Sequence, residues 1–255
     1  MGAHQRIGRR ITVEVSMLAP KERMTLTLLS DLHVGSRESQ HARIQEVIQQ
    51  IADTPNLYGV LIGDLANMAL KESKSDIYQS ALNPQEELEL LQKWFLPIKH
   101  KLLAAVPGNH EMRAWRGAGM DMTSILAQYL GIPHGQTSLI LQQKVGDTPY
   151  TIFIHHGIPT GGRTTGKFES NHRLAQMVDA DCYLSGHIHH GYTMREGHYL
   201  PQSDGTLALH EHVFATCTSY TGYEPYAEWS GFPPGIIRPM YLEFSPTVRD
   251  ITVTF

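Results

Sequence analysis

Short apolar runs, each followed by turn-forming residues, recur along the chain. They are rich in aliphatic side chains and too short for most helices, a pattern typical of buried strands. The runs occupy residues 24–30, 57–62, 102–106 and 181–184. Residues 137–143 and 150–154 are expected to pair as a hairpin, because Gly146 and Asp147 between them favour a turn.

Segments with a helical pattern of apolar residues lie between the first three predicted strands. One helical face is formed by Ile44, Val47, Ile48 and Ile51. We expect Ser39 to cap this helix and residues 53–55 to end it. A capping box with proline at its first helical position, residues 83–86, predicts a second helix that runs to Pro97. Its inward stripe is Leu88, Leu91 and Phe95, and a third helix is expected at residues 121–130.

Strands alternating with helices and then mostly strands indicate an α/β (α+β) protein with mixed sheets and outer helices. No internal repeat or charged linker divides the chain, so we predict one domain over residues 1–255. The predicted strands and motifs fall within residues 24–195, and residues 196–255 are expected to add C-terminal strands and a loop. Residues 218–235, rich in aromatic residues, glycine and proline, predict an ordered loop.

Composition places the chain among ordinary folded proteins. Of its 255 residues, 41% are hydrophobic and 18% are charged, which argues against a disordered or fibrous chain. The net charge of −4 excludes a global positive field for a long polyanion. Neither a signal peptide nor a membrane-length apolar run is recognisable, and only Cys182 and Cys217 are present. We therefore expect a cytoplasmic protein without membrane contact; its oligomeric state stays open.

Polar residues gather where the predicted strands end. The clusters are residues 31–33, 63–67, 108–111, 155–156 and 186–190. Open α/β sheets bind ligands at the carboxyl ends of their strands, so these clusters are expected to meet. They contain several of the chain's 15 histidines, and imidazole is the commonest ligand of transition metals. The joint pattern predicts a metal site, although each cluster alone is an ordinary turn or cap.

Two neighbouring cations need about four protein ligands each, including a carboxylate able to bridge them. The candidate ligands are Asp31, His33, Asp64, Asn109, His155, His187 and His189. Asp64 is the expected bridge. This mixture of nitrogen and oxygen donors suits transition metals better than magnesium or calcium. We expect two divalent transition-metal ions, manganese first, with iron, zinc, cobalt and nickel as alternatives.

In this order the clusters resemble the motifs of the calcineurin-like metallophosphoesterase superfamily, which read D-x-H, G-D-x-x-[D/N], G-N-H-[D/E], H and G-H-x-H. The resemblance spans residues 31–190 and implies a β-sandwich flanked by helices, with a two-metal phosphoesterase site. It implies that one metal takes Asp31, His33, Asp64 and His189, and the other Asp64, Asn109, His155 and His187. His110 matches the histidine of the family that faces the phosphate and protonates the leaving oxygen.

Two positions need separate treatment. Some branches of the superfamily have an aspartate that orients the catalytic histidine where this chain has Asn67, which puts that supporting hydrogen bond in doubt. The doublet of His155 and His156 offers two candidate ligands. We favour His155, because the first residue binds in related forms of the motif, and expect His156 to face away or to touch substrate.

The substrate-binding candidates are basic residues near the motifs. Arg113 and Arg116 follow the G-N-H-E motif, and Arg163 and Lys167 lie in the glycine-rich residues 161–167. Arginine, lysine and glycine-rich backbone amides can hold a phosphate or a nucleic-acid backbone, and Trp115 or Tyr223 can stack a base. A solvated loop with a buried tryptophan explains the same residues equally well.

Three functions follow from this pattern. The first is phosphodiester hydrolysis by a metal-activated hydroxide, with a nucleotide or nucleic acid as substrate, in either a nuclease or a phosphodiesterase. Asp64 and His110 are then the catalytic residues. The second is a phosphomonoesterase acting on a protein or a small molecule. The third is a non-catalytic metal-binding interaction module, as in a retromer subunit of similar fold that has lost ligands.

Overall fold

Two β-sheets form the frame of the molecule. The computed structural model describes residues 9–14, 22–71, 78, 80–159, 164–223 and 225–255. The six-stranded sheet has the order β1-β5-β6-β7-β9-β8, and its strands are β1 (Arg9–Glu14), β5 (Ser138–Val145), β6 (Thr148–His155), β7 (Cys182–Ser185), β8 (Tyr192–Pro201) and β9 (Leu207–Thr216). The five-stranded sheet has the order β11-β10-β2-β3-β4, formed by β11 (Ile251–Thr254), β10 (Tyr241–Phe244), β2 (Met24–Leu29), β3 (Leu57–Ile62) and β4 (Leu102–Val106).

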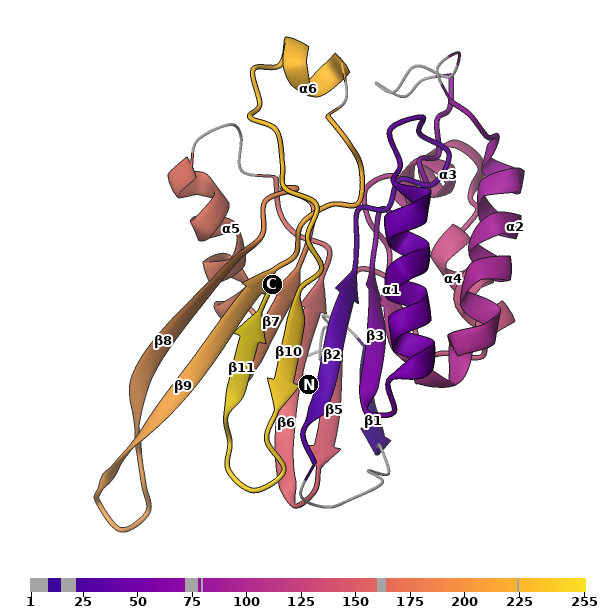
Figure 1. Cartoon of the computed structure of the whole chain (residues 1–255). Helices are drawn as coiled ribbons and strands as arrows, with labels where there is room; N and C mark the ends of the chain where they lie inside the picture. Colours follow the sequence, from indigo (N-terminus) through magenta and orange to yellow (C-terminus); the bar gives the residue numbers. More distant parts are fainter. Residues whose placement is uncertain (1–8, 15–21, 72–77, 79, 160–163, 224) are drawn as a thin grey trace, which may run out of the picture.

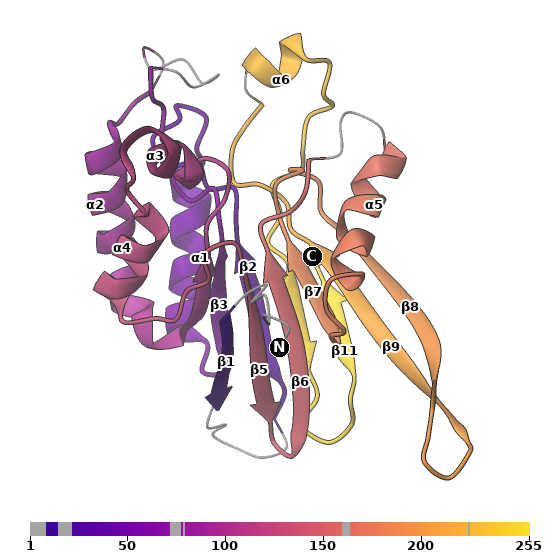
Figure 2. The same cartoon turned by 180° about the vertical axis from the view of Figure 1, so that it is seen from behind.

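The helices cover the outer faces of these sheets (Figures 1 and 2). Those beside the five-stranded sheet are α1 (His41–Asp53), α2 (Pro84–Phe95), α3 (Glu111–Ala118) and α4 (Met122–Leu130). The six-stranded sheet carries α5 (Thr164–Ala175), and a short helix, α6 (Pro225–Trp229), lies in the loop before β10. The predicted architecture of mixed sheets flanked by helices is confirmed.

One apolar core joins the two sheets. Met24, Leu26 and Leu28 of β2 pack in it with Leu139 of β5 and Ile152 of β6. A second core lies between the five-stranded sheet and its helices, and a smaller one lies beneath α5. Because side chains alternate across a strand, β2 contributes to cores on both of its faces. This explains why its sequence reads as a continuous apolar run.

Most predicted elements occur within a residue or two of their expected ends, but the first helix is capped differently. It begins at His41 with Gln40 at the N-cap and no side-chain cap, whereas Ser39 was expected there. The Ser39 hydroxyl instead donates to the Leu32 carbonyl at 2.7 Å, which ties down the loop after β2. The Asn83 capping box is confirmed, and after Phe95 the chain continues as a 3₁₀ helix, η1 (Leu96–Lys101), through Pro97.

Strand direction places the functional loops on one edge of the molecule. In the five-stranded sheet β2, β3 and β4 are parallel, and in the other sheet β6, β7 and β9 are parallel. The loops that follow parallel strands leave a sheet on the same side. All five polar clusters of the sequence follow one of these strands.

Two further observations concern apolar helices and cysteines. No helix within the described ranges combines the length and apolar character that a bilayer crossing requires. Cys182 and Cys217 are both buried free thiols, and burial raises the pKa of each above its usual range.

A buried carboxyl group lies under the loop after β3. Glu87 of α2 is fully buried, and its Oε2 accepts a hydrogen bond from the Met68 amide at 2.9 Å. Its Oε1 has no hydrogen-bond partner in the described part of the chain. Burial, with the nearby Glu111, raises the pKa of Glu87 from 4.5 to about 8. The folded protein therefore keeps a proton that the unfolded chain has lost at neutral pH.

This proton makes stability depend on pH. Between pH 4.5 and 8 the folded state binds more protons than the unfolded state, so the contribution of Glu87 to the free energy of unfolding falls as pH rises. The decline is on the order of 1.4 kcal/mol per pH unit. We expect Glu87→Gln to flatten it in urea unfolding measured across this range. The exposed Glu89→Gln is the matched control, and an unchanged slope in Glu87→Gln would contradict the assignment.

Candidate metal centre

The loops after the parallel strands are joined by backbone hydrogen bonds. The Asp31 amide donates to Gly63 at 3.0 Å and the His33 amide donates to Asp64 at 3.0 Å, which extends the β2 and β3 pairing beyond the strands. In the six-stranded sheet, the Gly186 amide donates to the His156 carbonyl at 2.8 Å, which extends the β6 and β7 pairing in the same way. Within each sheet, the main chain therefore holds neighbouring clusters together.

Backbone strain concentrates on the candidate ligands. Five of the six non-glycine residues with positive φ in the described ranges are Asp31, His33, Asp64, His187 and His189. Their φ values lie between 45° and 71°, a left-handed region that is uncommon outside glycine. Such strain persists only where the surroundings fix it, and it clusters at functional sites. The loops are thus bent to direct these side chains inward.

Asp31 organises the first group of ligand atoms. Its Oδ2 accepts hydrogen bonds from the Ser30 hydroxyl at 2.6 Å and from the His187 amide at 2.9 Å. Its Oδ1 has no hydrogen-bond partner among the described residues and lies 3.2 Å from His189 Nε2 and 3.9 Å from His33 Nε2. One carboxylate oxygen is therefore fixed by the scaffold, and the other faces two imidazoles.

Asp64 organises the second group in the same way. Its Oδ1 accepts the His110 amide at 2.7 Å, and its Oδ2 lies 3.2 Å from His156 Nε2 and 3.8 Å from His110 Nε2. His187 joins Asp64 and His156, with ligand atoms within 4.8 Å of one another. His33 and Asp64 also converge with His110, so this set connects the two groups.

The histidine doublet is placed differently from our expectation. His156, not His155, lies beside Asp64, and its Nδ1 is 2.7 Å from the Ile62 carbonyl of the other sheet. A carbonyl only accepts, so this bond puts the proton on Nδ1 and leaves Nε2 as the ligand atom. His155 ends β6, where alternation directs it to the opposite face, and its Nδ1 accepts the Gly157 amide at 2.9 Å. We therefore replace His155 by His156 in the candidate ligand set.

Two glycines of the motifs make room for the carboxylates. A Cβ atom at Gly108 would lie 2.2 Å from Asp64 Oδ1, and one at Gly186 would lie 2.5 Å from Asp31 Oδ2. Contacts this short are not tolerated between a side chain and a fixed carboxylate. Glycine at these two positions is thus a requirement of the ligand geometry.

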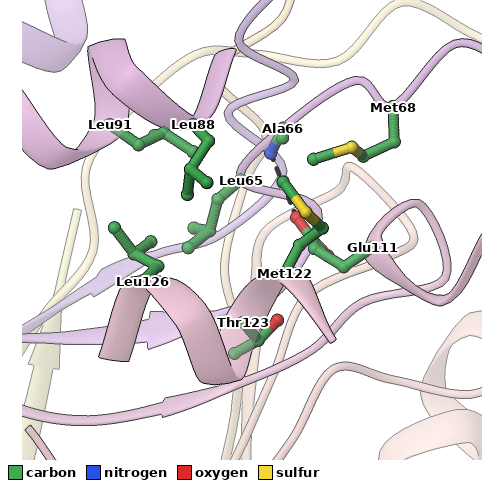
Figure 3. Close-up of a pocket in the computed structure, with 9 residues that line it drawn as sticks. All are labelled: Leu65, Ala66, Met68, Leu88, Leu91, Glu111, Met122, Thr123 and Leu126. Carbon is green, nitrogen blue, oxygen red and sulfur yellow. Dashed lines mark hydrogen bonds between the residues drawn. The ribbon is translucent and has the colours of Figure 1, made fainter. Parts of the chain in front are cut away.

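The buried Glu111 carboxylate fixes two of the loops through their backbone amides. Its carboxylate accepts the amides of Asp64 at 2.9 Å, Ala66 at 3.0 Å and Gly108 at 2.8 Å. Figure 3 shows its bond to Ala66. The small cavity that Glu111 lines there has a volume of about 10 Å³, enough for one water at most, so it is not a substrate pocket. Glu111 fixes the main chain around Asp64 instead of facing the ligand atoms.

His110 is oriented by a main-chain carbonyl. Its Nδ1 is 2.7 Å from the Asn67 carbonyl oxygen, which therefore accepts the proton of this nitrogen. The Asn67 side chain donates to Ser80 at 3.3 Å, so the backbone, and not the asparagine side chain, supplies the support that we had doubted. The Arg113 guanidinium lies at 2.9 Å from His110 Nε2 and also donates to the Asn67 carbonyl at 3.2 Å.

The buried carboxylates and the neighbouring histidines shift one another's pKa values. Although burial favours the neutral acid, His189 holds the pKa of Asp31 below its ordinary value, and His156 does the same for Asp64. Burial opposes protonation of His156, but the Asp64 carboxylate raises its pKa to about 10. Burial and the neighbouring His110 lower the pKa of His33. The site is therefore strongly polarised, with two ionised carboxylates among imidazoles.

The donor set fits divalent transition metals. Asp31, His33 and His189 form one set, and Asp64, His156 and His187 form the other. Asp31 Oδ1 and His156 Nε2 are buried without hydrogen bonds to the described residues, as expected of atoms reserved for a ligand. Asn109 lies exposed in the turn before α3, and its role as a ligand stays a prediction.

The remaining substrate-binding candidates are scattered. Arg113 is half-buried beside His110, and Arg116 is exposed one turn further along α3. Arg163 lies outside the described residues, and of Lys167 only the backbone, in α5, is described. The structure therefore leaves the proposed basic loop as a prediction.

Two contributions to the site were not predicted from the sequence. Glu111 was visible in the G-N-H-E motif, but its role depends on amides from two other loops. The segment after β9 also reaches the site: the Tyr220 amide donates to the Asp31 carbonyl at 2.9 Å, and a Cβ on Gly235 would lie 2.7 Å from the His189 carbonyl. The aromatic loop thus begins and ends beside the ligands.

Comparison with known proteins gives a family match. The sequence model of calcineurin-like phosphoesterases matches residues 24–191. A search of curated proteins gives no match. Vacuolar Protein Sorting 29 from Cryptosporidium parvum is similar in structure, with 12% identity, a TM-score of 0.46 and coverage of 91% of this chain and 97% of that one. A metallophosphoesterase from Sphaerobacter thermophilus has 16% identity, a TM-score of 0.43 and coverage of 90% and 86%.

The histidine doublet offers a direct test of the ligand assignment. After loading with Mn²⁺ and removal of free metal, we expect His156→Ala to lose one ion per chain, because its Nε2 faces Asp64 at 3.2 Å. His155→Ala, the adjacent and matched control, should keep the wild-type content. Elemental analysis measures both, and circular dichroism confirms folding. Loss of metal from His155→Ala alone would reverse the assignment.

Proposed function

Because the chain belongs to the calcineurin-like phosphoesterase family, we propose that it hydrolyses phosphodiesters of nucleotides or nucleic acids with two divalent transition-metal ions, manganese first. The observation that carries the proposal is the matched geometry of Asp31 and Asp64. Each carboxylate has one oxygen bound to the scaffold and one facing imidazoles. His110, which is not needed for either set of three ligands, lies beside them.

The position of Asp64 next to both sets of ligand atoms supports a site for two ions. Ions bound there would neutralise phosphoryl oxygens and lower the pKa of a bound water so that it can attack phosphorus at neutral pH. Asp64 lies with His156 and His187 in one group of ligand atoms and with His33 of the other set in a second group, which makes it the best placed bridging ligand. The backbone bonds of Glu111 hold Asp64 in that position.

His110 is suited to move a proton. Its Nδ1 proton is committed to the Asn67 carbonyl, so Nε2 is the nitrogen that takes up or releases a proton. The Nε2 atom lies 3.8 Å from Asp64 Oδ2, at the edge of the ligand groups. We assign it the protonation of the leaving oxygen. The Arg113 guanidinium beside it can bind a phosphoryl oxygen.

Two exposed tryptophan side chains support a substrate with bases. Trp229 in α6 is 89% exposed. The loop that contains α6 begins at Tyr220, which binds the Asp31 carbonyl, and ends at Gly235, which packs against the His189 carbonyl. Trp115 on α3 is also exposed. Stacking on an aromatic ring contributes about 1–3 kcal/mol per base. These side chains have little use for a small phosphomonoester.

The substrate class is tested by comparing esters on Mn²⁺-loaded protein. We expect kcat/KM for bis-p-nitrophenyl phosphate to exceed that for p-nitrophenyl phosphate, with turnover of cyclic nucleotides or single- or double-stranded DNA. Trp229→Ala should raise KM for the nucleotide substrate about 5- to 100-fold, as loss of one stacking contact implies, and leave bis-p-nitrophenyl phosphate unaffected. A clear preference for the monoester would favour a phosphatase instead, and no hydrolysis by metal-loaded protein would favour a binding module.

The role of His110 is tested by the basicity of the leaving group. A general acid matters most when the departing oxygen is basic, so His110→Gln should lower kcat by about 10²- to 10⁴-fold for a ribose or alkyl leaving group. The loss should be clearly smaller for p-nitrophenolate, and both ions should stay bound. Equal losses on both esters, or loss of metal, would show that His110 is not the proton donor.

A further inference from the structure

A second histidine cluster lies on the β8–β9 hairpin. His198 and His210 are opposite each other in the antiparallel pair, and His212 lies two residues further along the same face of β9. The ring centroids of His198 and His212 are 4.5 Å apart, and those of His210 and His212 are 4.7 Å apart. Three imidazoles are therefore packed together on a surface that the phosphoesterase site does not use.

The cluster is separate from the candidate metal centre. It adjoins residues 179–181, which precede β7, whereas His187 and His189 follow the other end of that strand. Both figures show the hairpin beside β7 and extending beyond the rest of the sheet. β8 is also the edge strand of its sheet, so this region has few other contacts to hold it.

The hydrogen bonds of His212 prepare its ring as a ligand. The side chain is 7% exposed, and its Nδ1 lies 2.6 Å from the Ala180 carbonyl, which only accepts. The proton is therefore on Nδ1, and the lone pair of Nε2 faces His198 Nδ1 at 2.8 Å. A metal-binding histidine characteristically donates its other nitrogen to a backbone carbonyl in this way.

Asp179 supplies an oxygen beside the two nitrogens. Its Oδ1 lies 3.9 Å from His212 Nε2, and the ligand atoms of Asp179, His198 and His212 all lie within 4.8 Å of one another. The Asp179 side chain is largely exposed and can move toward the histidines. Two imidazoles and a carboxylate are a common ligand set for zinc, with water in the fourth position.

Further imidazole and charged side chains surround the cluster. The ring of His210 stacks on that of His198, with the two centroids 5.5 Å apart. His210 Nε2 and Asp181 Oδ1 are buried and have no hydrogen-bond partner within the described ranges, although they face each other at 3.5 Å. The Arg249 guanidinium lies 3.3 Å from that Asp181 oxygen. Glu196 is paired with His212 across the hairpin, so its carboxylate is on the same face as the cluster.

We propose that Asp179, His198 and His212 bind one divalent transition-metal ion of the zinc class, separate from the phosphoesterase site, and that this ion joins the β8–β9 hairpin to the segment before β7. Binding needs a change of tautomer at His198, whose proton moves from Nδ1 to Nε2, and a small adjustment of side chains, in which the exposed Asp179 carboxylate moves toward the two nitrogens. The ligands are then supplied by the two strands of the hairpin, the segment before β7 and one water. The ion has a structural role in holding the edge hairpin.

The test counts ions in the full-length protein. After equilibrium dialysis against Zn²⁺ and removal of free metal, His198→Gln and Asp179→Asn should each bind one ion per chain fewer than the wild type. His172→Gln is the matched control: His172 contacts Glu196 of the same hairpin at 3.3 Å but lies outside the proposed ligand set. It should bind as many ions as the wild type, and all variants should keep their phosphoesterase activity.

The result is independent of the phosphoesterase site. In a His156→Ala background, His198→Gln should still remove one further ion, because the two sites share no ligand. If His198→Gln and Asp179→Asn both retain the wild-type number of zinc ions, the proposal is wrong. It is also wrong if His172→Gln loses the same ion, since the loss would then reflect the hairpin surface in general.

Discussion

Two buried carboxylates set the constraint under which the rest of the site is arranged. An ionised carboxylate in a protein interior costs several kcal/mol unless hydrogen bonds and opposite charges compensate it. Asp31 and Asp64 meet that cost in the same manner, with one oxygen bound to amides or a hydroxyl and the other turned toward imidazoles. Three features serve this need. Glycines leave room for the carboxylates, the buried Glu111 fixes the main chain at Asp64, and His156 is held by a hydrogen bond to the Ile62 carbonyl of the other sheet.

The strained loops depend on the rigidity of the sheets beneath them. A left-handed conformation costs an ordinary residue roughly 1–2 kcal/mol, and five candidate ligands adopt it. That cost is met by the packing of the strands, whose side chains fill cores on both faces of β2 and β3. A ligand set built on flexible loops would relax out of this geometry. The packed β-sandwich therefore holds the candidate ligands in strained backbone conformations that direct their side chains toward one another.

The sequence was sufficient for the central buried strands and for the convergence of the polar clusters, because buried parallel strands have continuous apolar patterns and end at one edge. It did not predict β1 and gave no bounds for β8 to β11. At the doublet, analogy with related motifs favoured His155, whereas the structure places His156 beside Asp64, because adjacent residues of a strand point to opposite faces. The roles of the buried Glu87 and Glu111 were not predictable from the sequence either. A buried carboxyl is explained only by its amide partners, and Met68, Ala66 and Asp64 come from a different loop.

The long-range pairing of the strands has a consequence for synthesis of the protein on the ribosome. β2 lies between β3 and β10, and its residue Leu26 is paired with Leu242. Its parallel partner β3 and the helices that cover this sheet emerge early, whereas β10 emerges only after most of the chain has been made. Until then one edge of β2 exposes unpaired amides and carbonyls, the kind of surface that pairs with other chains. The nascent protein must therefore protect an open sheet edge for most of its translation, and its slowest folding step is expected to come last.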